Sequence, residues 1–383
     1  MTGPVPLTPI QHAFFELEAP EPHHYNQAVL LEVHQPGLAD AAEQALQAVL
    51  EHHDALRLRF ERTADGWRQE NAGTQGRVVL RRVDLSAVPE GEQPEAIAKV
   101  AAEVQASLDL SSGVLVKAAW IDRGAGRTAR LLWVLHHHAV DGVSWRVLLE
   151  DFATALGLAA RGEKVALPPK TTSFKAWAEK LEEHARSEKL EAERAFWEEQ
   201  ARVQVRPLPL DKSGGTNTVA LARSVSVSLD AEETALLLRE APSAWRARLD
   251  DVLAPRRWRT RLHGWTGERA VRSGPGGPLP RPGGWTAWTC RARWAGSPPC
   301  TPSCWRCRRT GTLGDGLRSV RDTLRAVPGR GQGFGLLRYL GREEASATLR
   351  AVPHADIAFN YLGQLDATAR GSDLLGPAPE GSG

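Results

Sequence analysis

Apolar residues at helical spacing alternate with short apolar runs of strand length along most of the chain. Apolar side chains three and four positions apart predict amphipathic helices, whereas alternation or a short continuous apolar run predicts a strand. We therefore expect helices over residues 7–18, 38–53, 95–107, 145–160, 174–200, 231–253, 311–326 and 333–340. We expect strands over residues 26–33, 55–61, 78–83, 114–121, 129–135, 219–229 and 357–364. The alternation of the two kinds of element predicts an α/β fold.

The central apolar run, Ala129–Leu135, leads directly into three histidines, His136–His138. Asp141 and Gly142 follow, and the next helix begins soon after them. Glycine supplies the backbone freedom that a tight turn needs, and an aspartate can accept hydrogen bonds from local amides. The pattern predicts a buried strand that delivers imidazoles to its C-terminal end, where their direction is fixed by the turn.

The formal net charge of +2 hides an uneven distribution. Residues 253–310 contain twelve Arg and one acidic residue, Glu268, which gives a net charge of +11, so the other residues carry −9. An acidic body with one basic insert argues against nucleic-acid binding as the main function. The chain opens without the basic start and apolar core of a signal peptide, and no apolar run is long enough to span a bilayer. We expect a soluble cytoplasmic protein that binds no membrane.

Several motifs resemble those of the epimerization domains of nonribosomal peptide synthetases, a branch of the condensation-domain superfamily. The pattern HHxxxDG, read as His136, His137, Asp141 and Gly142, resembles the superfamily signature. The longer string HHHAVDGVSWRVLLED resembles the epimerization branch more specifically. Three flanking motifs agree in the expected order: Leu7–Gln11 with Phe14–Glu16, His24–Gln27, and Phe359–Gln364.

The resemblance implies two chloramphenicol-acetyltransferase-like lobes with the active site between them. The N-terminal lobe would cover residues 1–168 and carry HHxxxDG, and the C-terminal lobe would cover residues 169–383. The second lobe would be incomplete, because the family continues for several elements beyond Gln364, whereas this chain ends in a Gly- and Pro-rich stretch. We interpret this ending as a truncated C-terminus.

Residues 254–310 show no period of a helix or a strand, and we expect them to be aberrant or disordered. A shifted reading frame explains their composition, because GC-rich codons for Trp285–Pro302, moved by one base, can encode a string that resembles the family sequence at this place. Four thiolates could bind zinc, but their spacing fits no common zinc motif, and a disulfide is disfavoured in a cytosolic chain. All the cysteines lie in this stretch, at Cys290, Cys300, Cys304 and Cys307.

The reaction implied is the removal of the Cα proton from an aminoacyl or peptidyl thioester and its return to the other face. A neutral histidine suits the base, since its ordinary pKa lies near neutrality, and the resemblance assigns this role to His137. Neighbouring residues on a strand face opposite sides of the sheet, so His136 and His137 cannot both enter one site, and we expect His136 to have a structural role. His138 lies on the same face as His136 and replaces an apolar residue usual in the family. Tyr361 is a candidate hydrogen-bond donor to the enolate oxygen.

Three further residues, Asp141, Gly142 and Arg57, are expected to support the site without reacting. Asp141 would hold the turn with Gly142 and form a buried ion pair with Arg57. Loss of either charged partner should then lower the stability of the fold more than it alters the reaction.

The opposite-face acid of the family comes from an EGHGR element that is absent here, and the context of Glu268 does not match it. We therefore expect the chain as written to be impaired or inactive.

The substrate would arrive on the phosphopantetheine arm of a peptidyl carrier protein, so we expect no cofactor of the chain's own and no metal. The other partners implied are adenylation and condensation domains of the same assembly line in secondary metabolism and antibiotic biosynthesis. Two alternatives stay open. One is a condensation domain that forms a peptide bond with the same histidine, and the other is a non-catalytic domain that only binds the carrier protein.

Overall fold

The computed structural model of the chain describes residues 2–74, 77–203, 208–210, 212, 214, 218, 221–246, 249, 252, 270–275, 303–306, 313–352, 357–359 and 373–382. These residues form two compact units. The first unit holds the residues up to Ser187 and the described C-terminal residues 373–382, and the second begins at Glu188 and holds the described residues up to 359. The division along the chain thus falls after residue 187, later than the boundary at 168 that the sequence suggested.

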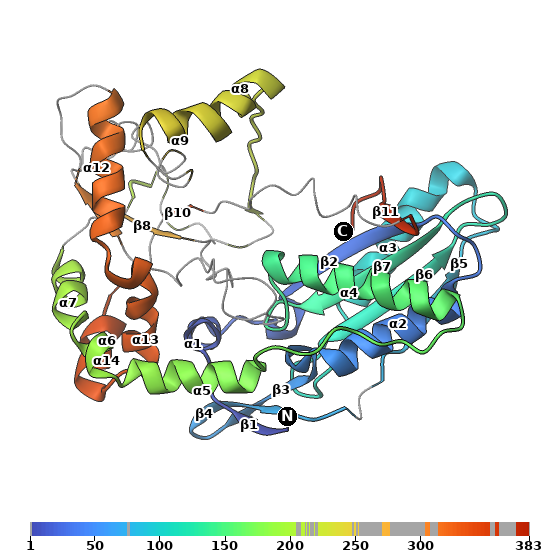
Figure 1. Cartoon of the computed structure of the whole chain (residues 1–383), viewed down its shortest axis with the longest axis horizontal. Coiled ribbons are helices and arrows are strands. Elements are labelled where there is room, and N and C mark those ends of the chain that lie inside the picture. The colour runs from blue at the N-terminus through green and yellow to red at the C-terminus, as the bar shows by residue number, and fades with distance from the viewer. Residues whose placement is uncertain are drawn as a thin grey trace. The chain divides into compact units, whose positions relative to one another are not determined.

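A five-stranded mixed sheet organises the first unit, in the strand order β11-β2-β7-β6-β5 (Figure 1). Its strands are β2 (Asn26–Val33), β5 (Leu80–Asp84), β6 (Val116–Asp122), β7 (Ala129–His136) and β11 (Leu375–Pro377). β7 is antiparallel to both of its neighbours, β2 and β6, whereas β5 runs parallel to β6. The strand that ends in histidines is therefore the central strand of the sheet.

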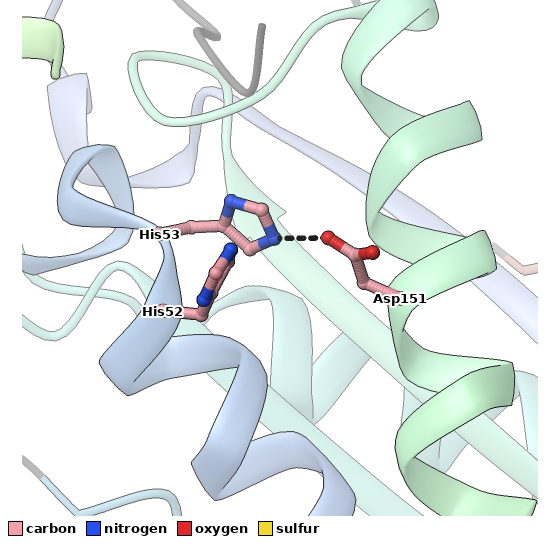
Figure 2. Close-up of side chains that lie close together, drawn as sticks. All are labelled: His52, His53 and Asp151. Atoms are coloured by element: carbon pink, nitrogen blue, oxygen red, sulfur yellow. Dashed lines mark hydrogen bonds and ion pairs between the residues drawn. The ribbon is translucent and has the colours of Figure 1, made fainter. Parts of the chain in front are cut away.

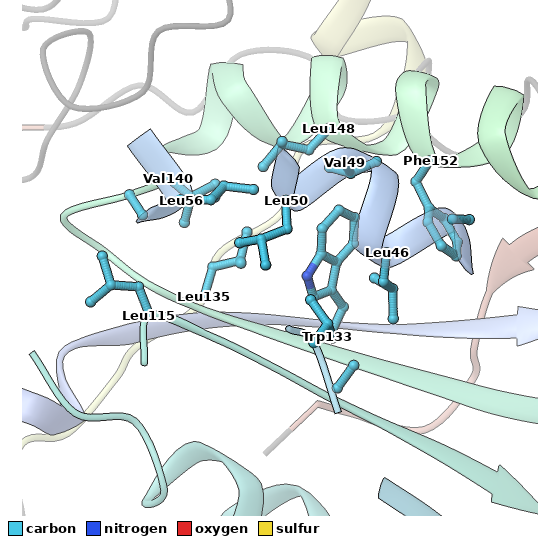
Figure 3. Close-up of a cluster of buried hydrophobic side chains, with 14 of the residues drawn as sticks. Leu46, Val49, Leu50, Leu56, Leu115, Trp133, Leu135, Val140, Leu148 and Phe152 are labelled. Carbon is cyan, nitrogen blue, oxygen red and sulfur yellow. The ribbon is translucent and has the colours of Figure 1, made fainter. Parts of the chain in front are cut away.

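Helices cover both faces of this sheet: α2 (Ala39–His52) and α4 (Gly142–Ala160) pack on one face, and α3 (Gln93–Gln105) packs on the other. Because side chains alternate along a strand, β7 contributes Trp133 and Leu135 to the first core and Leu132 and Val134 to the second. Figure 3 shows Trp133 and Leu135 against residues of α2 and α4. A strand buried on both faces requires a continuous apolar sequence, and this explains the run from which β7 was predicted.

A second, three-stranded antiparallel sheet of this unit has the order β1-β4-β3. Its strands are β1 (Gly3–Val5), β3 (Leu58–Thr63) and β4 (Gly66–Asn71). Thr8 is the N-cap residue of the helix α1 (Pro9–Glu16), and its backbone N–H donates to Gln11 Oε1 at 2.9 Å. Gln11 Nε2 donates in turn to Gln69 Oε1 at 2.9 Å, which joins α1 to β4. The last helix of the unit is α5 (Phe174–Ala185), capped by Ser173.

The described part of the second unit combines short helices with a small sheet of order β10-β8-β9. The sheet comprises β8 (Ala270–Pro275), β9 (Ser303–Arg306) and β10 (Ile357–Phe359). The helices are α6 (Glu188–Glu191), α7 (Arg194–Arg202), α8 (Ala231–Ala235), a π-helical turn (Leu236–Glu240), α9 (Ala241–Ala244), α12 (Leu313–Ala326), α13 (Gln332–Leu340) and α14 (Glu343–Arg350). The ring of Trp197 on α7 packs 5.7 Å from that of Phe334 on α13.

Most elements predicted in the first half of the chain are confirmed within a few residues, and the strand over 26–33 is confirmed at both ends. Other predictions are wrong. The segment 55–61 starts as a 3₁₀ turn, Asp54–Arg57, and the helix over 174–200 breaks into three. Residues 221–229 form no strand, and Val225 and Val227 are 94% and 88% exposed. Two strands, β8 and β9, form within the stretch that was expected to lack structure, whose remaining residues lie outside those described.

The C-terminal stretch, interpreted from the sequence as a truncated end, contributes structure to the first unit. β11 pairs antiparallel with β2, and Glu380 forms a bidentate ion pair with Arg130 of β7, at 2.8 Å to Nε and 3.1 Å to Nη2. Arg130 is only 2% exposed. Burial, the largest single influence, would raise the pKa of Glu380. The hydrogen bonds from Arg130, a backbone hydrogen bond and the positive charges of Arg130 and Arg123 together outweigh it, so the pKa lies below its usual value.

We expect Glu380→Gln to lower the free energy of unfolding by about 2 kcal/mol, because a charged hydrogen bond to a buried guanidinium is lost. The depressed pKa means that this stabilisation is present above the unfolded-state pKa and is lost as the pH falls through the folded-state value. Urea unfolding at pH 7 measures the difference. Glu163→Gln is the matched control, since the pair of Glu163 with Arg161 is exposed. Equal unfolding midpoints for the two variants would contradict the expectation.

Candidate active site

The first candidate site residue, His137, directly follows the central strand. Its backbone N–H donates to Tyr25 O at 2.8 Å, so the pairing of β2 with β7 continues one residue beyond β7. Tyr25 therefore lies opposite His137, and the two rings stack with centroids 4.8 Å apart. The side chain of His137 is 7% exposed and lies among polar groups, not in purely apolar packing.

Hydrogen bonds define the tautomer of His137. Its Nδ1 lies 2.8 Å from Val140 O, and because a carbonyl oxygen only accepts, Nδ1 carries the proton. Its Nε2 lies 3.0 Å from Nε2 of Gln27, which donates to it. The neutral ring therefore has its lone pair on Nε2. This is the form of imidazole that can take a proton from a substrate.

His136 faces the other side of the sheet and is fully buried, as expected for a residue of the architecture. Its Nε2 donates to Pro22 O at 2.9 Å, and its Nδ1 accepts from the backbone N–H of His138 at 3.1 Å. Burial lowers the pKa of His136 to about 4, although the bond to Pro22 acts in the opposite direction. Near neutral pH this ring is therefore uncharged and fixed.

His138 lies among aromatic rings, with the Phe14 centroid at 4.5 Å and the Phe60 centroid at 5.1 Å. Its Nε2 is buried without a hydrogen-bond partner. Burial holds its pKa well below the usual value. The environment is one that an apolar side chain would fill, so this histidine packs as a neutral ring and does not face the side occupied by His137.

Asp141 holds the turn, as predicted, by capping α4: its Oδ1 accepts from the backbone N–H of Ser144 at 2.8 Å and from the Ser144 hydroxyl at 2.6 Å. Gly142 is the first residue of α4. The expectation that this glycine supplies unusual backbone freedom is wrong, because its φ is not positive. A Cβ at Gly142 would meet no atom within 4 Å, so the position is open on this side.

The predicted ion pair between Arg57 and Asp141 does not form. Arg57 instead pairs with Asp54, three residues before it, and donates to the carbonyl oxygens of Leu50 and Glu51 at the end of α2. The 3₁₀ turn that replaces the start of the predicted strand turns the guanidinium toward these groups. Arg57 therefore stabilises the connection from α2 to β3, and it is not a partner of the turn after β7.

Comparison with known proteins identifies the family. A family model described as "Condensation domain" matches residues 1–274. The chain belongs to the condensation-domain family. One of the linear gramicidin synthase proteins of Brevibacillus parabrevis is 40% identical over 391 residues, which is 98% of this chain and 7% of that protein. Chondramide synthase cmdD of Chondromyces crocatus is 40% identical over 395 residues, 99% of this chain and 10% of that synthase.

Solved structures agree with this membership. The epimerization domain from the third module of tyrocidine synthetase B superposes with a TM-score of 0.84 at 29% identity, covering 100% of this chain and 84% of that one. The first condensation domain of the CDA synthetase gives a TM-score of 0.60 at 20% identity, covering 86% and 77%, and supports the fold alone. The expected α/β condensation-domain fold is thus confirmed. The chain spans a tenth or less of the two synthases named above.

Tyr361, the candidate hydrogen-bond donor of this condensation-domain chain, lies outside the described residues, so its role stays a prediction. Glu268, to which no acid role was assigned, and three of the four cysteines, Cys290, Cys300 and Cys307, lie outside them as well. Sequence analysis left two residues without a role: Gln27, which is hydrogen-bonded to His137, and Trp145, which is hydrogen-bonded to Gln27. They belong to stretches quoted for the family resemblance, and this was the only signal for them.

Among the described residues, one group of three side chains could hold a metal ion: His52, His53 and Asp151, whose ligand atoms lie within 4.8 Å of one another (Figure 2). His53 Nε2 and Asp151 Oδ2 are 2.9 Å apart, the length of a hydrogen bond. Two ligands of one tetrahedral zinc ion would be about 3.3 Å apart, given bonds of about 2.0–2.1 Å. We interpret the buried pair as a tie between the end of α2 and α4.

No helix among the described residues is long and apolar enough to cross a membrane.

The buried His136 makes stability depend on pH. Below pH 6.5 the unfolded-state imidazole binds a proton, whereas the folded one does so only near pH 4, so stability falls as the pH falls through this window. The shift corresponds to a loss on the order of 3 kcal/mol. We expect the stability difference between the parent and His136→Gln to shrink between pH 7 and pH 4, as measured by urea unfolding. Parallel profiles would show that His136 is not buried in neutral form.

The pair of His53 with Asp151 gives a second expectation. Asp151→Ala leaves His53 buried without its partner and should lower the free energy of unfolding by about 3 kcal/mol. His52→Ala is the matched control, because His52 is the one half-exposed member of the group and does not contribute to that hydrogen bond. Thermal unfolding of the three proteins provides the comparison, and equal losses in both variants would argue against a structural pair.

Proposed function

We propose that this condensation-domain chain is an epimerization domain acting on the Cα of an aminoacyl or peptidyl thioester. The observation that carries the proposal is the tautomer of His137, whose Nδ1–H donates to Val140 O and whose Nε2 has the lone pair. The solved epimerization domain also matches the entire chain with a higher TM-score than the condensation domain, 0.84 against 0.60. A neutral imidazole with a directed lone pair is the base that such a reaction needs.

The thioester makes the Cα proton removable, because the carbanion left behind is delocalised as an enolate. When His137 takes the proton at Nε2, the ring becomes an imidazolium and still donates from Nδ1 to Val140 O. The carbonyl dipole thus favours the charged form of the base at the moment of transfer. His136 and His138 do not oppose this charge strongly, since burial keeps both neutral near pH 7.

The substrate would be tethered to the phosphopantetheine arm of a carrier protein, and no cofactor of the chain's own is proposed. The relatives are named as synthases and synthase subunits many times longer than this chain. This supports neighbouring adenylation, carrier and condensation domains as partners in one assembly line. Their identity here, and the amino acid carried, belong to the proposal and not to the fold.

Return of the proton to the opposite face needs a second acid on that side. The EGHGR element that provides it in epimerization domains is absent from this sequence. With a base on one face only, the proton or deuteron that His137 holds goes back to the face from which it came. We therefore propose that this chain exchanges the Cα hydrogen of its substrate with solvent faster than it inverts the centre.

The test uses the full chain in D2O with a carrier protein loaded through phosphopantetheine with each of several L-amino acids. We expect deuterium at Cα with little of the D-amino acid, measured by mass spectrometry and chiral chromatography after release from the carrier. His137→Gln should lower the exchange rate at least about 100-fold, the usual contribution of a general base. His52→Ala is the control for an unrelated histidine substitution.

Each other outcome bears on one part of the proposal. Exchange that His137→Gln leaves unchanged would refute the base, and rapid conversion to the D-amino acid would refute the impairment. Peptide-bond formation with an added acceptor aminoacyl carrier, without Cα exchange, would establish the condensation alternative. Carrier binding without any His137-dependent turnover would establish a docking role.

A further inference from the structure

Gln27 joins two side chains that lie far from it in the sequence. Its Oε1 accepts from the indole Nε1–H of Trp145 at 2.9 Å, and its Nε2 lies 3.0 Å from Nε2 of His137. Gln27 is half-buried, and Trp145 is 7% exposed. The three side chains thus form a hydrogen-bonded row that ends at Val140 O, beyond the imidazole.

Only one arrangement of protons satisfies this row. The indole N–H can donate but not accept, so it must face the amide oxygen of Gln27, and the amide nitrogen must face His137. An amide nitrogen only donates, so Nε2 of His137 must accept. The proton of the neutral ring is then on Nδ1, the tautomer that the Val140 carbonyl requires as well. Both ends of the row favour the same tautomer, so the preference should weaken when either end is lost.

The backbone explains why these residues meet. Gln27 of β2 lies opposite Leu135 of β7. His137 comes two residues after Leu135, on the same face of the sheet, so the Gln27 amide reaches the imidazole as a diagonal neighbour. Trp145 lies in the first turn of α4, which Asp141 caps, and its ring packs edge-on against Trp133 at 5.4 Å. The central strand and the capped helix therefore both orient the indole N–H.

We propose that Gln27, itself oriented by Trp145, is a positioning residue that selects the Nδ1–H tautomer of His137 and keeps its Nε2 available as the base. The catalytic purpose of this arrangement rests on the proposed function, whereas the NMR test of the tautomer requires no turnover. The donated hydrogen bond also favours the neutral ring between turnovers, because a protonated Nε2 cannot accept it. Substrate binding must displace the amide from Nε2 before the proton can move.

Removal of the indole N–H of Trp145 tests whether Gln27 selects the tautomer of His137, without a change in either of these two residues. In Trp145→Phe nothing holds the amide, so it can rotate and offer Oε1 to His137, which is compatible only with a proton on Nε2. We expect the ¹⁵N chemical shifts of His137 to change from those of a pure Nδ1–H tautomer to those of a mixture. The measurement is long-range ¹H–¹⁵N NMR on histidine-labelled protein, with the signal assigned by its loss in His137→Gln.

Trp133→Phe is the matched control, since this neighbouring indole N–H is buried without a hydrogen-bond partner. It removes a similar amount of core packing and should leave the His137 shifts as in the parent. Gln27→Met, at a half-buried position, provides a second route to a mixed tautomer if Trp145→Phe does not fold. A parent ring protonated on Nε2, or parent-like shifts in both test variants, would overturn the inference.

Gln27→Glu provides a readout in the reaction itself. A carboxylate beside Nε2 favours the protonated imidazolium, so the acid limb of the pH profile for Cα exchange should move upward by about one pH unit or more. The nearby titratable groups are Tyr25, stacked on the ring, with His136 and His138, which burial keeps neutral. An unmoved acid limb would contradict the positioning role. Absence of exchange in the parent would count against the proposed function alone, because the NMR result is independent of turnover.

Discussion

The register between β2 and β7 is the constraint on which the rest of this site depends. β7 is buried on both faces, and each of its apolar side chains packs in one of the two cores. A register slip of one residue would therefore move Trp133 and Leu135 into the core formed with α3. The same slip would place His136 where His137 now lies. The apolar packing that stabilises the sheet therefore also decides which imidazole lies beside Tyr25 and Gln27 and which one is buried on the other side.

Two adjacent histidines are held in opposite tautomers at the end of this strand. His136 donates from Nε2 to Pro22 O and accepts at Nδ1, whereas His137 donates from Nδ1 to Val140 O and accepts at Nε2. In each case a backbone carbonyl oxygen accepts the hydrogen bond from the ring N–H, and the position of that carbonyl follows from the chain on either side of the strand. Residue type alone does not distinguish these two imidazoles, but the direction of their hydrogen bonds does.

The sequence was sufficient for the parts that a local pattern determines. Apolar runs of strand length predicted β2, β6 and β7, and the helical period of apolar residues predicted α2, α3 and α4. β4 was missed because its sequence, GWRQEN, is polar and glycine-initiated, although the Asp65-Gly66 pair at its start is a hairpin signal. β11 was missed because a short Gly- and Pro-containing segment becomes a strand only through pairing with β2.

The errors at the site have the same origin. The sequence places Arg57 in a strand, whereas it lies in the 3₁₀ turn Asp54–Arg57, and it gives no information about which acid lies nearer. Asp54 is within reach through this local turn. An alternating pattern over 219–229 predicts a strand, but residues 221–229 have no partner strand among the described residues and their apolar side chains stay exposed. Strand pairing and burial depend on the whole fold, whereas a period along the chain indicates only which secondary structure a segment can adopt.

Gln27 and Trp145 illustrate what a motif can mean physically when its members carry no reactive chemistry. They are 118 positions apart, and neither an amide nor an indole is a useful base, so no argument from residue type would place them in a mechanism. Their contribution is the direction of three hydrogen bonds, which is only defined once β2, β7 and α4 are packed together. The base proposed here is therefore specified by the donors and acceptors around His137 as much as by the residue itself, and a chain that keeps HHxxxDG but loses either partner would keep the imidazole with a less defined lone pair.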